Sequence, residues 1–308
     1  MQKIIRIGTR ESQLAVWQAN EVKNLLSKNG FSSELIYIKS EGDIDLHTPL
    51  YEMGVQGVFT RSLDLALLND RIDIAVHSMK DVPTSLPEGI VQSAILERGS
   101  YKDIFVYKQD ADFLNDLNAS AIIATSSIRR KSQWLNRYPN HRIENIRGNV
   151  NTRLKKILEQ DWKGAIFAAA GLERIQVRPE NSIDLDWMLP APAQGAIMIV
   201  CRKNDYYCLE CCASINHADT ATCTKIERDF LRTLLGGCST PISALAKIDA
   251  AGFIRFEGNI LSLNGKEKAS IEITVPLSDY VELGKIAAVQ ILDNGGSSIA
   301  EKMRNTAK

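Results

Sequence analysis

A cysteine and a carboxylate stand out among the residues that could do chemistry. Cys238 follows Gly236 and Gly237 at the end of a predicted helix, and paired glycines let the backbone turn the thiol outward. Such a thiol can be a nucleophile or a cofactor attachment point, and an inert core thiol is the alternative. Asp81 follows Lys80 at the carboxyl end of a predicted strand. A carboxylate among cations can stabilise a cationic intermediate and relay protons, whereas the alternative role is an N-cap.

Arginine or lysine recurs beside small hydroxyl residues at the ends of several predicted strands. In open α/β sheets, ligands bind at these carboxyl ends, where helix N-termini present free N–H groups. Because guanidinium groups bind carboxylates bidentately, one cleft between two lobes could hold a ligand with many carboxylates or phosphates. Solvated helix caps are the alternative for any single turn. The turns are residues 8–12, 77–81, 125–130, 147–153 and 171–174.

The other cysteines and one histidine favour structural roles. Cys208 and Cys211 have the C-x-x-C spacing of zinc ligands, but the second half of a four-ligand site is irregular. We therefore expect thiols near a domain junction and no bound metal. His77 precedes Ser78, and adjacent strand residues point to opposite faces, so the two do not form a nucleophile and base pair. His77 is expected to be a core histidine with satisfied hydrogen bonds.

Alternating strands and helices must position these turns. Short apolar runs predict the strands, and apolar residues at helical spacing predict the helices. The pattern restarts after a polar stretch near residues 108–120, so we expect two α/β lobes, each with a mostly parallel sheet. The predicted strands are residues 4–7, 35–38, 72–76, 121–124, 143–146 and 165–170. The predicted helices are residues 15–26, 60–68, 128–135 and 150–158.

A third region follows a hinge. Leu189 to Gly195 contains two prolines and ends in a glycine, which is typical of a hinge, and we expect the chain to return there to the first lobe. Beyond residue 217, two helices and two strand-like runs around the Asn264-Gly265 hairpin signal predict a small α+β domain. The expected domains are residues 1–98 with 196–215, residues 102–192, and residues 217–308.

Composition narrows the class of protein. A chain of 308 residues exceeds one domain of roughly 100 to 200 residues, and Lys+Arg balance Asp+Glu at 37 each. Residues 129–156 are basic, but their arginines lie in separate turns and aromatic residues make up only 6% of the chain, so no nucleic-acid partner is expected. No stretch approaches the ~20 apolar residues of a membrane span, and no export signal is evident. We therefore expect a cytoplasmic protein with reduced thiols.

The chain resembles the porphobilinogen deaminase family from Ile4 to about Ala246. The resemblance is carried by residues 75–84, 147–153 and 236–238, in the family's order. It implies two lobes like those of periplasmic binding proteins and a third domain that carries a cofactor cysteine. It further implies a transferase of haem and porphyrin biosynthesis, a hydroxymethylbilane synthase that condenses four porphobilinogen molecules into a linear tetrapyrrole with release of ammonia. A monomer is the default expectation for the oligomeric state.

The same resemblance implies a role for each site residue. Cys238 would carry a dipyrromethane cofactor through a thioether. Asp81 would bind pyrrole N–H groups, assist departure of the aminomethyl nitrogen and stabilise the resulting cation. The residues implied to bind the cofactor, besides these two, are Lys80, Ser127, Arg129 and Arg130. The residues implied to bind the carboxylates of the substrate and the growing chain are Arg10, Ser12, Arg147, Arg153, Arg174 and Gln194. No metal and no nucleotide is implied.

The sequence also departs from the family pattern. Glu52 and Gln56 stand where many members carry lysines, residues 99–102 replace a more usual acidic-Pro-Arg stretch, and Ala193 occupies a usual glycine of the hinge. A catalytically inactive relative is therefore one alternative. A two-lobed receptor that binds a carboxylate ligand without reacting is a second alternative, and a zinc-dependent module is a third.

Overall fold

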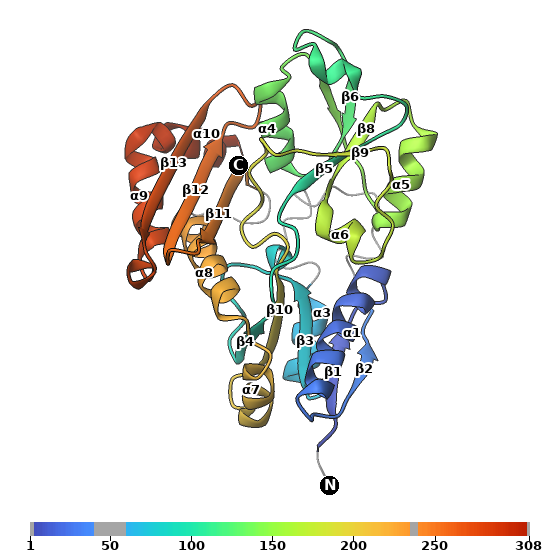
Figure 1. Cartoon of the computed structure of the whole chain (residues 1–308), viewed down its shortest axis with the longest axis vertical. Coiled ribbons are helices and arrows are strands. Elements are labelled where there is room, and N and C mark those ends of the chain that lie inside the picture. Colours follow the sequence, from blue (N-terminus) through green and yellow to red (C-terminus); the bar gives the residue numbers. More distant parts are fainter. Residues whose placement is uncertain (1–2, 40–59, 235–239, 307–308) are drawn as a thin grey trace. The chain divides into compact units, whose positions relative to one another are not determined.

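The computed structural model describes residues 3–39, 60–234 and 240–306 (Figure 1). Cys238 and the two departures at Glu52 and Gln56 lie outside the described residues. The described chain forms two compact units. The first unit consists of the residues up to Gly99 together with Gly195–Ala221, and the second consists of Ser100–Gln194 together with the residues from Thr222 onward.

The first unit is built on a five-stranded sheet with the order β2-β1-β3-β10-β4. β2, β1 and β3 are parallel, whereas β10 is antiparallel to both of its neighbours. The strands are β1 (Ile5–Thr9), β2 (Ser33–Tyr37), β3 (Ile74–Ser78), β4 (Ile90–Ile95) and β10 (Ile197–Arg202). The helices are α1 (Gln13–Lys28), α3 (Arg61–Leu68) and α7 (Tyr206–Ala213), with a 3-10 turn at Met79–Asp81 after β3.

The second unit contains a five-stranded sheet of the same design, with the order β7-β6-β8-β5-β9. Three parallel strands again lie beside one antiparallel strand, here β5. The strands are β5 (Asp103–Tyr107), β6 (Ile122–Ala124), β7 (Arg142–Glu144), β8 (Gly164–Ala168) and β9 (Ser182–Asp184). The helices are α4 (Ile128–Arg137), α5 (Val150–Glu159) and α6 (Ala169–Glu173), with a 3-10 turn at Asp112–Asn115.

Each five-stranded sheet is mostly parallel, as expected, but each also contains one antiparallel strand that the sequence did not indicate. β10 enters the first sheet from a point in the chain about a hundred residues after β4, and Met198 pairs with His77 on one side and with Ile95 on the other. Local hydrophobic patterns do not report such long-range pairing, and the strands β4, β5, β9 and β10 were not among those predicted from the sequence. The expectation of two α/β lobes with a small C-terminal sheet domain is otherwise confirmed.

The C-terminal part of the second unit is a three-stranded antiparallel sheet covered by helices. Phe230 of α8 packs against Phe256 of β12, and a side chain at Gly258 would clash with the Phe230 ring. The strands are β11 (Ile242–Ile248), β12 (Phe253–Leu261) and β13 (Lys268–Pro276). The helices are α8 (Ala218–Thr233), α9 (Leu283–Ile291) and α10 (Ser297–Thr306), with a π turn at Leu292–Gly296 before α10.

The predicted Asn264-Gly265 hairpin is present, and it packs against helix α4. Asn136 Nδ2 donates to the Gly265 carbonyl oxygen at 2.7 Å. Gly265 has a φ of 73°, and a Cβ atom there would lie 2.5 Å from the Ser132 carbonyl oxygen. Position 265 therefore requires glycine, because its φ is positive and because its backbone lies close to the backbone of α4.

Within the described ranges, no helix combines the length and the apolar character that a bilayer crossing requires.

Candidate active site

One edge of the first sheet gathers Arg10, Lys80 and Asp81. β1 and β3 are parallel neighbours, with Ile7 opposite Ile74, so the residues that follow the two strands lie at the same edge of the sheet. Arg10 follows β1, and Lys80 and Asp81 form the 3-10 turn after β3. Three of the residues expected to bind or react are thus brought together by strand pairing alone.

The Asp81 carboxylate is half-buried and makes no hydrogen bond or ion pair within the described part of the chain. Its main chain is nevertheless fixed by its neighbours. Met79 donates its N–H to the Ala196 carbonyl oxygen at 3.0 Å, and Ser78 Oγ accepts from Gln18 Nε2 at 2.9 Å. A carboxylate held in this way can accept hydrogen bonds from a ligand without first breaking bonds of its own.

His77 is buried, but the expectation that its hydrogen bonds are satisfied is wrong. Its Nε2 atom has no hydrogen-bond partner within the described residues. Burial, together with a smaller effect of the positive charge of Arg10, lowers the pKa of His77 to about 3. The imidazole is therefore neutral at physiological pH, and the effect of Arg10 shows that its charge acts at the end of β3.

Serine and asparagine residues begin the helices after the strands. Ser12 Oγ accepts from the Ala15 N–H at 3.4 Å, and Ser127 Oγ accepts from the Arg130 N–H at 3.4 Å. Asn149 caps α5 in the same way, accepting from the Thr152 N–H at 3.0 Å. Each side chain satisfies one free N–H of its helix. The ligand contacts expected of Ser12 and Ser127 stay predictions beside this capping role.

The second sheet presents a comparable edge. Ser126 Oγ donates to the Ile146 carbonyl oxygen at 2.7 Å and accepts from the Ile146 N–H at 2.9 Å, which joins the turn after β6 to the turn after β7. Arg147 follows directly and is 7% exposed. Arg153 Nε donates to the Gly148 carbonyl oxygen at 2.8 Å, and Arg174 ends the short helix α6 after β8. Arginines from three turns therefore lie at the carboxyl ends of β6, β7 and β8.

Arg129 and Arg130 are buried against a single carboxylate, that of Asp103. Asp103 Oδ1 accepts from Arg130 Nε at 3.0 Å and from Arg130 Nη2 at 2.8 Å. Asp103 Oδ2 lies 2.7 Å from Arg129 Nη2, and Arg129 Nη1 donates to the Leu189 carbonyl oxygen at 2.9 Å. The pKa of Arg129 is lowered by burial. The negative charge of Asp103 raises this pKa, and the neighbouring positive charge of Arg130 lowers it. Two guanidinium groups against one carboxylate leave a net positive charge here.

Gln194 joins the same network from the hinge. It is fully buried, and its Nε2 atom lies 2.8 Å from the Tyr101 carbonyl oxygen and 2.9 Å from Asp103 Oδ1. Its amide nitrogen thus binds protein groups, and the substrate contact expected of Gln194 stays a prediction. Sequence reasoning missed Asp103, whose only signal was a lone acid at the start of an apolar strand.

The cysteines other than Cys238 are buried, and they lie in or beside a protein core. Cys201, Cys208, Cys211 and Cys212 pack in the core of the first unit. Burial raises the pKa of Cys212 to about 12, so its thiol stays protonated and unreactive at physiological pH. Within the described ranges, no group of three or more His, Cys, Asp and Glu side chains is arranged to hold a metal ion.

Known proteins resemble this chain over nearly its full length. The family model described as "Porphobilinogen deaminase, dipyromethane cofactor binding domain" matches residues 5–210, and "Porphobilinogen deaminase, C-terminal domain" matches residues 221–293. Porphobilinogen deaminase from Pelobacter propionicus is 41% identical, with 97% of each chain covered. The chloroplastic porphobilinogen deaminase of Oryza sativa subsp. japonica is 40% identical, covering 98% of this chain and 87% of its own.

Solved structures give a weaker likeness. The methionine-binding protein MetQ aligns with a TM-score of 0.43 at 13% identity, over 70% of this chain and 91% of its own. The ligand-binding core of GluR0 in complex with L-glutamate aligns with a TM-score of 0.40 at 10% identity, over 69% of this chain and 90% of its own.

The two matching family models and the curated relatives define an enzyme of the transferase class. The chain belongs to the porphobilinogen deaminase family. The larger of its matched domains is the family's dipyrromethane cofactor-binding domain, so the cofactor expected from the sequence is confirmed. Its attachment to Cys238 stays a prediction, because Cys238 lies outside the described residues.

Proposed function

We propose that this protein is a hydroxymethylbilane synthase. It condenses four porphobilinogen molecules, one at a time, into a linear tetrapyrrole and releases one ammonia for each molecule added. The observation that carries the proposal is the Asp81 carboxylate, which stands beside Arg10 and Lys80 at a sheet edge and makes no hydrogen bond or ion pair within the described residues. A receptor that only binds carboxylates has no use for a negative charge at that place.

Asp81 is proposed to carry the chemical step. Its carboxylate accepts hydrogen bonds from pyrrole N–H groups and thereby orients the ring of the incoming substrate. As the aminomethyl nitrogen leaves, positive charge develops on that ring, and a fixed carboxylate stabilises this charge more than it stabilises the ground state. The 3-10 turn holds the carboxylate in place before the reaction begins, so little reorganisation is needed.

The arginines are proposed to hold the acetate and propionate groups of cofactor, substrate and growing chain. Arg147 and Arg153 follow β7 and Arg174 follows β8, and a guanidinium group binds a carboxylate through two parallel hydrogen bonds. Arg10 and Lys80 offer the same chemistry at the edge of the first sheet. Several separate cationic turns suit a ligand whose carboxylates are spread over many pyrrole rings.

The residues present suit a dipyrromethane group. Arg129 Nε is a buried donor with no acceptor within the described residues, and Arg129 and Arg130 together exceed the charge of Asp103 by one. Both features favour an anionic group at this end of α4. When bound, the dipyrromethane supplies the pyrrole carbon from which the chain grows. We propose that Cys238 holds it through a thioether and that Lys80, Ser127, Arg129 and Arg130 orient it.

The proposal also covers the cellular location, the oligomeric state and the partners of the enzyme. We propose that the enzyme acts in the cytoplasm, as a monomer, on a small-molecule substrate, and that it has no nucleic-acid or membrane partner. The balance of 37 basic and 37 acidic residues supports the absence of a polyanionic partner, because electrostatic attraction dominates nonspecific binding to nucleic acid.

A turnover assay with porphobilinogen tests the proposal. The purified protein should consume porphobilinogen, release equimolar ammonia, and form a linear tetrapyrrole that cyclises to uroporphyrinogen without further enzymes. Binding of porphobilinogen without ammonia release would instead identify a receptor. Loss of activity on zinc chelation, with recovery on zinc addition, would identify the zinc-dependent module.

A further inference from the structure

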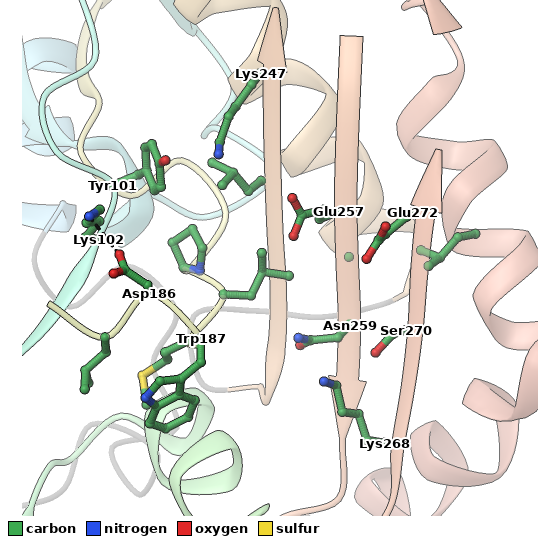
Figure 2. Close-up of a pocket in the computed structure, with 17 residues that line it drawn as sticks. Tyr101, Lys102, Asp186, Trp187, Lys247, Glu257, Asn259, Lys268, Ser270 and Glu272 are labelled. Carbon is green, nitrogen blue, oxygen red and sulfur yellow. Dashed lines mark ion pairs between the residues drawn. The ribbon is translucent and has the colours of Figure 1, made fainter. Parts of the chain in front are cut away.

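A cavity lies within the second unit, and two of its lining residues, Tyr101 and Leu189, also supply carbonyl oxygens to the Asp103 network described above (Figure 2). It has a volume of about 220 Å³. One wall is Leu185–Pro190 together with Tyr101 and Lys102, and the other is a face of the C-terminal sheet. Ile254, Phe256 and Ile260 of β12 belong to the core under the helices, so the alternate residues of that strand line the cavity.

Oxygen-bearing side chains form two adjacent rows on this face. Glu257 of β12 is opposite Glu272 of β13, and Asn259 is opposite Ser270. The two rows are about 7 Å apart along the strands, since each residue advances the chain by roughly 3.4 Å. All four residues line the cavity, and Figure 2 shows them side by side on β12 and β13. The middle of the wall is therefore rich in hydrogen-bond acceptors.

One of these acceptors is buried without a partner, whereas the two glutamates are exposed and form no ion pair within the described residues. Asn259 is 4% exposed, and its Oδ1 atom has no hydrogen-bond partner within the described residues. Glu257 and Glu272 form no ion pair with any described residue, although Arg255 lies only one row away. Like charges directly opposite each other on a sheet are unfavourable, and a buried acceptor without a donor is unfavourable too. A cation with several N–H donors would relieve both.

Lysines stand at the two ends of the acceptor rows. Lys247 pairs with Arg255, one row beyond the glutamates, and Lys268 pairs with Leu261, one row beyond Asn259. Lys247 Nζ lies 4.8 Å from the centre of the Tyr101 ring. Neither lysine forms an ion pair with a described residue, so both can bind a carboxylate. By contrast, Lys102 is already paired with Asp184 and Asp186.

We propose that this cavity binds a small zwitterion that carries a primary ammonium group and a carboxylate. The ammonium group donates its three hydrogens to Glu257, Glu272 and Asn259, and the carboxylate pairs with Lys247 or Lys268. The flanking lysines disfavour a bare divalent cation, which they would repel. The volume suits a ligand of amino-acid size, since each water molecule occupies roughly 30 Å³ in the liquid.

The probe for this site is 4-aminobutyrate, added to the full-length purified protein while the side-chain amide signals of Asn259 are followed by NMR. We expect a saturable shift of those signals. Glu272→Gln should weaken binding roughly tenfold, because one charge-assisted hydrogen bond becomes a neutral one. Glu301→Gln is the matched control, because Glu301 is exposed on α10, and it should leave binding unchanged.

Butylamine and butyrate each carry one half of the proposed recognition, and both should bind more weakly than 4-aminobutyrate. Three results would overturn the proposal. Asn259 signals that do not respond to 4-aminobutyrate would show that the cavity does not bind such ligands. Equal affinity for butylamine would remove the carboxylate from the recognition, and a shift of the same signals by Mg²⁺ or Ca²⁺ alone would identify a metal site instead.

Discussion

Arg130 and Asp103 are joined inside the second unit by two hydrogen bonds to one oxygen atom, from Nε at 3.0 Å and from Nη2 at 2.8 Å. The second oxygen of Asp103 faces Arg129 at 2.7 Å. Asp103 is fully buried, and both arginines are less than a tenth exposed. A single carboxylate at the start of β5 thus fixes two guanidinium groups in the first turn of α4. It acts as a positioning residue for two of the proposed cofactor ligands.

Asp103→Asn should destabilise the protein by about 3 to 5 kcal/mol, because it leaves two buried guanidinium groups without a counter-charge. Urea unfolding measures the change. Asp186→Asn is the control, because the Asp186 side chain is 74% exposed and its ion pair with Lys102 should contribute less than about 1 kcal/mol. Equal effects of the two substitutions would show that the buried network does not stabilise α4.

Gly265→Ala should separate the hairpin from α4. The added Cβ atom would lie 2.5 Å from the Ser132 carbonyl oxygen and 2.6 Å from the Asn136 backbone nitrogen. The positive φ of 73° would destabilise the alanine variant further. Gly252→Ala is matched in backbone angle, with a φ of 79°, but meets nothing within 4 Å. We expect Gly252→Ala to cost about 1 kcal/mol and Gly265→Ala clearly more. Thermal unfolding of both variants compares them, and equal losses would contradict the packing of the hairpin.

The free energy of unfolding should depend on pH because His77 is buried. Burial, assisted by Arg10, lowers its pKa to about 3 in the folded protein, whereas the unfolded chain has a value near 6.5. Between these values the unfolded state binds the extra proton, so stability falls as the pH falls, by up to about 1.4 kcal/mol per pH unit. The difference in free energy of unfolding between wild type and His77→Gln should therefore shrink from pH 7 to pH 4. A constant difference would mean that His77 keeps an ordinary pKa.

Asp81→Asn should abolish most turnover and leave the fold intact. The carboxylate makes no hydrogen bond or ion pair with described residues, so its replacement costs little stability, but the transition state loses its counter-charge. We expect kcat to fall by about 10² to 10⁴-fold with an unchanged melting temperature. Asp110→Asn on the exposed surface is the control. A variant that retains normal turnover would remove Asp81 from the mechanism.

The local part of the fold could be predicted from the sequence. The helix of residues 128–135 was indicated by spacing, and so was the Asn264-Gly265 turn, because these signals lie within a few neighbouring residues. β10 was not predicted as a strand, and its antiparallel direction depends on long-range pairing, such as that between Met198 and His77. β11 was missed as well: only the two strands beside the Asn264-Gly265 turn were expected beyond residue 217.

The site was predictable to a similar degree. Strand ends with arginine indicated anion binding, because parallel strands bring their carboxyl ends to one edge. The burial of Arg129 was not predictable, since it depends on Asp103 and on the Leu189 carbonyl oxygen, which lies 60 residues away in the chain. The partnerless Nε2 of His77 was missed for the same reason, because spacing does not reveal which polar atoms find a partner.

Cofactor attachment and chain growth at Cys238 are tested most directly by the intact mass of the purified protein, with peptide mapping around Cys238, before and after addition of porphobilinogen. We expect a dipyrromethane-sized excess on the Cys238 peptide and a series of heavier species spaced by one pyrrole unit. Cys238→Ser should lack both the excess and the series. An unmodified Cys238 that never gains mass, even after prolonged incubation with porphobilinogen, would contradict the chain-building mechanism and favour a binding protein.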